Sequence, residues 1–127
     1  MTPDRHLAAL DLLRARPFGD RAHHLAELAT GDAAADPDPA GQAEAERTAL
    51  AGLLAARWGP PDRLALGSLL LRAERGERMP EPWDLLSASV PDVELWRVER
   101  RWIALGLLAA AGDTYRLLVC VTEVDPP

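Results

Sequence analysis

The sequence predicts an α+β domain in which N-terminal helices pack on a C-terminal antiparallel sheet of three to four strands. The first observation is a run of β-rich segments between Val93 and Val124, separated by short polar or glycine-containing breaks that are typical of hairpins. The second is the helical spacing of leucines upstream of that run. Because a sheet of three strands needs an apolar cover, we expect the helices to supply it.

The composition sets bounds on the class of protein. A length of 127 residues fits a single compact domain whose core needs no disulfide or metal. The formal charge of −6 disfavours nucleic-acid partners and anionic membrane surfaces. No segment has the apolar length of a membrane span or the pattern of a signal peptide, so we expect a cytoplasmic protein with no membrane or nucleic-acid partner. The absence of Lys and Asn indicates a high-GC, actinobacterial genome rather than selection for arginine chemistry.

Two helices are predicted at the N-terminus. Thr2-Pro3-Asp4 suits the first turn of a helix, and leucines at helical spacing extend that helix over residues 3–15, with Leu12 widening its apolar stripe. Asp20 is placed to cap a second, short helix over residues 21–30.

The middle of the chain alternates between loops and short elements. The segment 31–40 is rich in Asp and Pro, which predicts a flexible loop. Strong helix formers predict a helix over Gln42–Trp58 that ends at a Gly-Pro-Pro sequence and packs on the sheet. The alternating run 63–66 predicts a short strand at a sheet edge, and short helices are predicted over 69–76 and 82–88.

The C-terminal meander is predicted from residues 93–99, 101–109 and 114–124. The alternation of side chains makes both faces of its central part apolar. Therefore either helices cover part of both faces or the second face binds a partner. The Ala- and Leu-rich segment 101–109 also suits a helix, so both assignments stay open there.

Chemical motifs are scarce in this sequence. It contains no nucleophile elbow, no phosphate-binding glycine loop, no paired-cysteine metal spacing and no dinucleotide fingerprint. Cys120 lies between two valines, where a thiol behaves as a small apolar group. No catalytic residue is predicted, and the sequence favours a protein that is not an enzyme.

A weak metal-site alternative lies in residues 20–27. In a helix, the spacing of His23 and Glu27 would place an imidazole and a carboxylate on one face, with His24 beside them. A metal or proton-transfer site would need further ligands from elsewhere, and a solvated helix face explains the same residues. We therefore expect no metal and no cofactor, with His23, His24 and Glu27 as the alternative ligands.

The strongest candidates for partner binding are two tryptophans of the meander. Trp96 and Trp102 flank the predicted turn at Glu99-Arg100, so we expect them to form a cross-strand pair beside Arg97 and Arg101. Ordinary core packing is the alternative. If the pair lies on an uncovered face, it has the aromatic and arginine composition of an interface hot spot.

A second candidate surface is the acidic connection before the meander. It contains Glu77, Glu81 and Met79, and a basic partner would complement its charge, although such a run is commonly a solvated loop. The function that the sequence favours is therefore a protein-binding module of the adaptor, chaperone or immunity kind. The alternatives are a small-molecule-binding or enzymatic domain with a Trp-lined pocket, and a structural homodimer that self-associates through its sheet.

Overall fold

The computed structural model describes residues 3–29, 37–110 and 114–127. Within them the chain forms four helices and a five-stranded antiparallel sheet, which confirms the predicted α+β class. In chain order the elements are α1 (Pro3–Ala15), β1 (His23–Ala29), α2 (Pro39–Trp58), β2 (Asp62–Ala65), α3 (Gly67–Glu74), α4 (Trp83–Ser89), β3 (Asp92–Val98), β4 (Arg101–Ala110) and β5 (Thr114–Thr122).

The sheet contains the predicted meander at its centre. The strand order is β1-β5-β4-β3-β2, with each neighbouring pair antiparallel. Residues 101–110 form a strand, which settles the open assignment of that segment. Glu99 and Arg100, with φ of 59° and 95°, form the tight turn between β3 and β4. The predicted edge strand is also present as β2.

The predicted helix over residues 21–30 is wrong, because residues 23–29 form the strand β1. All seven residues pair with β5, from His23 opposite Thr122 to Ala29 opposite Arg116. Leu, Ala and Glu favour helices, but β5 lies deep in the molecule and needs a second neighbour for its backbone. Tertiary pairing therefore overrides local propensity and adds one strand to the predicted sheet.

Helix α2 begins earlier than the sequence indicates. Asp38 is its N-cap, and the side chain of Asp38 accepts a hydrogen bond from the amide of Gly41 at 3.1 Å. The last residues of the predicted loop 31–40 therefore belong to this helix and its cap, whereas residues 31–36 lie outside the described part of the chain. The helix ends at Trp58 as predicted, and Gly59 follows with φ of 87°.

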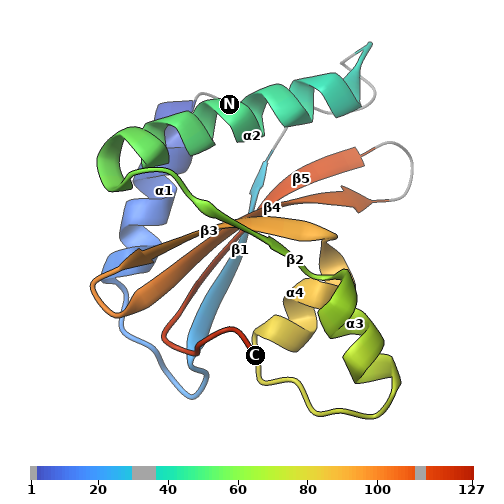
Figure 1. The fold of residues 1–127 in the computed structure, drawn as a ribbon. Coiled ribbons are helices and arrows are strands. Elements are labelled where there is room, and N and C mark those ends of the chain that lie inside the picture. The colour runs from blue at the N-terminus through green and yellow to red at the C-terminus, as the bar shows by residue number, and fades with distance from the viewer. Residues whose placement is uncertain (1–2, 30–36, 111–113) are drawn as a thin grey trace.

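The first face of the sheet is covered by α1 and α2. Figure 1 shows the sheet in the middle of the molecule with these two helices on one side and α3 and α4 on the other. The core on the first face joins apolar side chains of α1 and α2 to those of all strands except β2. Its buried members are Leu10, Leu28, Leu50, Ala51, Leu54, Trp96, Ile103, Leu105, Leu117, Val119 and Val121.

The second face is covered by α3, α4 and the C-terminal segment. Trp83 of α4 is fully buried there, and its Nε1 donates a hydrogen bond to the carbonyl of Val124 at 2.9 Å. Cys120 lies in the same core, and burial raises the pKa of its thiol to about 12, so the thiol stays protonated and unreactive at neutral pH. The two-sided apolar character of the meander is thus explained largely by helices on both faces.

A buried imidazole lies where α1 packs on α2. The His6 ring is fully buried, and its Nε2 lies 3.9 Å from the carboxylate of Glu46. Burial lowers the pKa of His6, although the neighbouring Glu46 carboxylate opposes that shift. Among the described residues, no helix has the length and apolar character needed to cross a membrane.

Candidate functional site

The two tryptophans predicted to form a partner-binding pair lie on opposite faces of the sheet. The β3–β4 register places Trp96 opposite Ile103 and Trp102 opposite Arg97. Because neighbouring positions along a strand point to opposite faces, the expected cross-strand pair is wrong. Trp96 is only 3% exposed; its Nε1 donates to the carbonyl of Gly59 at 2.9 Å, which fixes the ring in the core.

Trp102 belongs to a cluster that fastens the C-terminal segment. Its Nε1 donates to Asp125 at 2.9 Å, and Arg97 lies 4.8 Å above its ring while pairing with the same carboxylate at 3.0 Å. The hydrogen bond from Trp102, aided by Arg97, lowers the pKa of Asp125. Trp102 is partly buried and contacts Arg97 and Asp125 of its own chain. These three residues therefore form a small surface with apolar and charged parts, not an exposed aromatic patch.

Arg101 has a different role from Arg97, because its side chain lies on the first face. Its guanidinium donates to the carbonyls of Arg14 and Arg16 at 2.7 and 3.0 Å. It also lies 4.3 Å from the ring centre of Phe18. These contacts fix the end of α1 against the sheet, so the structure does not bring Arg97 and Arg101 together.

The acidic connection is divided between core and solvent. Met79 packs against the core of the second face, whereas Glu77 forms two hydrogen bonds with Arg72, at 2.6 and 2.9 Å. The hydrogen bond from Arg72 lowers the pKa of Glu77. Glu81 is exposed. The negative charge of Glu77 is therefore already paired with Arg72 of the same chain. This pairing reduces the attraction that the connection would have for a basic partner.

The alternative metal site at His23, His24 and Glu27 required a helix, whereas residues 23–29 form a strand. His23 and Glu27 point to the second face and His24 to the first, and residues four apart in a strand are separated by about 13 Å. Glu27 lies 3.5 Å from Arg116, and His24 stacks on Phe18 with ring centres 4.9 Å apart. Within the described residues, no group of three or more His, Cys, Asp or Glu side chains is close enough to hold a metal ion.

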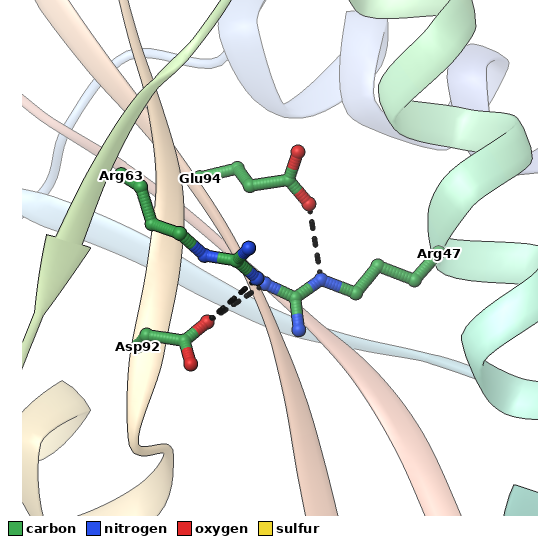
Figure 2. A network of polar contacts seen from close by, with 4 residues as sticks. All are labelled: Arg47, Arg63, Asp92 and Glu94. Carbon is green, nitrogen blue, oxygen red and sulfur yellow. Dashed lines mark hydrogen bonds and ion pairs between the residues drawn. The ribbon is translucent and has the colours of Figure 1, made fainter.

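A charged network that the sequence did not indicate joins α2 to the β2 edge (Figure 2). Arg47 donates to Asp92 at 2.9 Å and to Glu94 at 3.1 Å, and Arg63 of β2 reaches Asp92 at 3.3 Å. The hydrogen bond from Arg47 lowers the pKa of Asp92. Both carboxylates are bound by guanidinium groups, which suits a structural ion-pair network better than acid–base chemistry.

An apolar groove between α1 and β1 is the feature that the sequence analysis missed. It encloses about 580 Å³, a volume typical of a binding site. Its described lining is apolar except for one arginine. The lining residues are Ala9, Leu12, Leu13, Ala15, Arg16, Ala26 and Leu28. Leu12, expected in the buried stripe of the first helix, is 75% exposed at this groove.

The groove runs beside an open edge of the sheet. β1 pairs with β5 on one side, and within the described residues no strand pairs with the backbone groups on its other side. Leu25 points to the opposite face from the groove and is 41% exposed. Apolar side chains therefore flank this edge on both faces. We name the groove, β1 and Leu25 together the β1 edge surface.

Comparison with known proteins adds no relative. No family model, curated protein or solved structure matches this chain significantly. The candidate site therefore depends on geometry alone. No pattern in the sequence indicated the groove, because β1 was expected to be a helix and Leu12 was expected to widen the apolar stripe of the first helix.

Proposed function

We propose that this chain is a small cytoplasmic polypeptide-binding module, of the adaptor, chaperone or immunity kind, and that it binds through the β1 edge surface. The observation that carries the proposal is an outer strand with exposed leucines on both sides. An extended peptide added to such an edge gains main-chain hydrogen bonds, and adjacent apolar grooves take its side chains. The net charge of −6 supports a protein partner over nucleic acid.

The walls of the groove are held in place before any partner arrives. Arg101 binds the carbonyls at the end of α1, and His24 of β1 contacts the carbonyl of Arg16 at 3.1 Å. A preformed surface loses less conformational entropy on binding than a mobile one. This rigidity favours a binding role for the surface.

A small apolar ligand is the second candidate, because the groove volume falls in the range of small-molecule pockets. Arg16 would supply a cation for an acidic head group. The expected Trp lining has no support here, since the described lining contains no tryptophan. The groove also continues into a strand edge, which a small molecule would leave unpaired; this favours the polypeptide.

Photo-crosslinking tests the proposal. A photo-reactive amino acid at position 12 in cells should give an adduct that maps to one segment of one polypeptide, and Leu25→Lys should abolish it. Position 71 is the matched control, because Leu71 is a helical leucine that is 53% exposed on α3. Equal labelling from positions 12 and 71, or no polypeptide adduct, would refute the proposal. A bound small molecule found by native mass spectrometry would support the second candidate.

A further inference from the structure

The two edges of the sheet differ in their protection against pairing with another chain. β2 has only four residues, two of them charged, and follows Pro60-Pro61. β1 has seven residues, no proline and a single formal charge, at Glu27. Short length, charge and proline are the usual means of blocking a sheet edge, and β1 has little of any. Within the described residues, β1 is therefore the edge that is less protected against pairing with another strand.

Resting on the proposed function, we infer that the partner strand is β1 of a second copy of this chain. Two copies would pair antiparallel about a two-fold axis perpendicular to the sheet, and their two five-stranded sheets would become continuous. Such an axis maps each face of the sheet onto itself. Only registers centred on a residue are then allowed, because directly opposite residues must point to the same face.

The register centred on Leu25 is self-complementary. It places Leu25 opposite its own copy and His23 opposite Glu27 of the second copy, twice by symmetry. His23 is 7% exposed, and its Nδ1 has no hydrogen-bond partner among the described residues. A carboxylate beside this ring supplies an electrostatic partner. The neighbouring register, centred on Ala26, instead places Leu25 opposite Glu27 and mismatches both side chains.

The two-fold axis also places the apolar groove of each copy at the junction between the two copies. Because the axis preserves faces, the α1 helices of both copies lie on one side of the joined sheet, flanking the new strand pair. The exposed Leu12 side chains and the two apolar grooves then face one another across the junction. The acidic charge of the chain is not concentrated here, since Glu27 is the only formally charged residue of β1 and lies 3.5 Å from Arg116.

Disulfide trapping tests both the partner and the register. Leu25→Cys is made in a Cys120→Ala background, because Leu25 lies opposite Cys120 within the chain and two thiols there would permit an internal bond. A mild oxidant takes up the two electrons as two thiols join. We expect a disulfide-linked dimer, with roughly tenfold more product than Leu71→Cys in the same background, because pairing raises the effective concentration of the thiols.

Two further measurements make each outcome decisive. Light scattering on the unmodified chain should give twice the chain mass, and Leu25→Lys should give a monomer. If Ala26→Cys forms more dimer than Leu25→Cys, the proposed register is wrong. If the unmodified chain is a monomer at high micromolar concentration, the second-copy inference falls. The polypeptide-binding function would still stand in that case if position 12 captures a different polypeptide in cells, and both fall if it captures none.

Discussion

The two outer strands of the sheet, β1 and β2, differ in length, in charge and in the apolar side chains that border them. At β2, the carbonyl of Gly59 accepts a hydrogen bond from Trp96 just before the strand, and Arg63 pairs with Asp92 on the neighbouring strand. At β1, the outward edge is bordered by the exposed Leu12 and Leu25. The β2 edge is short, charged and bound to the core, whereas the β1 edge is longer, has one formal charge and is flanked by exposed leucines. We expect the β2 edge to contribute mainly to stability, and we propose the β1 edge for recognition.

This contrast also shows that exposed apolar area has to be considered together with strand position. Leu70 and Leu71 of α3 are exposed too, but they lie on a helix whose backbone groups are already paired. Leu25 lies on a strand whose outer backbone groups have no strand beside them in the described residues. Within the described residues, β1 is thus a strand edge at which main-chain pairing and apolar contact can act together, whereas α3 is not.

The largest effect is expected from removing the ring that anchors the β2 side. Trp96→Ala should lower the free energy of unfolding by about 3 to 5 kcal/mol, because it opens a cavity in the first core and leaves the carbonyl of Gly59 without its donor. Denaturant unfolding measures this loss. Trp102→Ala, at a partly buried site, is the control and should cost clearly less. Equal losses for both variants would show that Trp96 is not the anchor.

The charged network comes next in size. Arg47→Ala leaves Asp92 and Glu94 without their buried guanidinium, and we expect a loss of roughly 3 kcal/mol. Hydrogen exchange at β2 should accelerate while association through β1 is unchanged. Arg57→Ala is a matched control on the same helix, since Arg57 pairs with Asp11 at the surface, and it should cost less than about 1 kcal/mol. A loss of association in Arg47→Ala without unfolding would contradict the separation of the two edges.

A smaller effect on stability is expected from His6, which is buried where α1 packs on α2. Helix α1 forms one wall of the groove. Because the folded-state pKa of His6 is lowered from 6.5, the unfolded chain binds a proton more readily in this pH range. The stabilising contribution of neutral His6 is present above pH 6.5 and is lost as the pH falls from 6.5 through the lower folded pKa. Unfolding free energies measured between neutral and mildly acidic pH should show this fall.

His6→Gln should flatten the pH dependence of stability in that window, because Gln does not titrate. His24→Gln changes an imidazole at the β1 edge instead and is the matched control, which should keep most of the dependence. If the free energy of unfolding of His6→Gln kept the same pH dependence, His6 would not be the group that causes it.

The smallest effect on stability is expected at the β1 edge itself. Leu25→Lys should change the free energy of unfolding of the monomer by less than about 0.5 kcal/mol, because the side chain is already partly exposed. The same change should abolish association by placing a charge at the centre of the strand pair. Leu71→Lys should alter neither quantity. A strongly destabilised Leu25→Lys monomer would mean that Leu25 is a core residue rather than a recognition residue.

The sequence predicted the parts of the fold that local chemistry controls. Gly59-Pro60-Pro61 ends α2, the turn at Glu99-Arg100 joins β3 to β4, and alternating apolar residues form the central strands. The sequence did not predict β1, because its residues favour a helix and become a strand only through pairing with β5. The groove was missed with it, since its wall is made by that strand.

The expected tryptophan pair is wrong for a different reason. Which residues face one another across a hairpin depends on the register, and the tight turn at Glu99-Arg100 sets a register that places Trp96 and Trp102 on opposite faces. Since a two-residue turn fixes the register of a hairpin, the turn that the sequence predicts at Glu99-Arg100 already excludes the Trp96–Trp102 pair. The covering of the second face by α3 and α4, in contrast, depends on tertiary packing rather than on any local pattern.

Hydrogen exchange at the two edges tests the central claim most directly. The dilute chain is compared with its associated species, obtained by concentration or by adding the polypeptide that position 12 captures. We expect exchange in residues 23–29 to slow on association while exchange in residues 62–65 stays the same, because only β1 gains a neighbouring strand. Unchanged exchange in β1 on association, or slowing confined to β2, would contradict the assignment of recognition to the β1 edge.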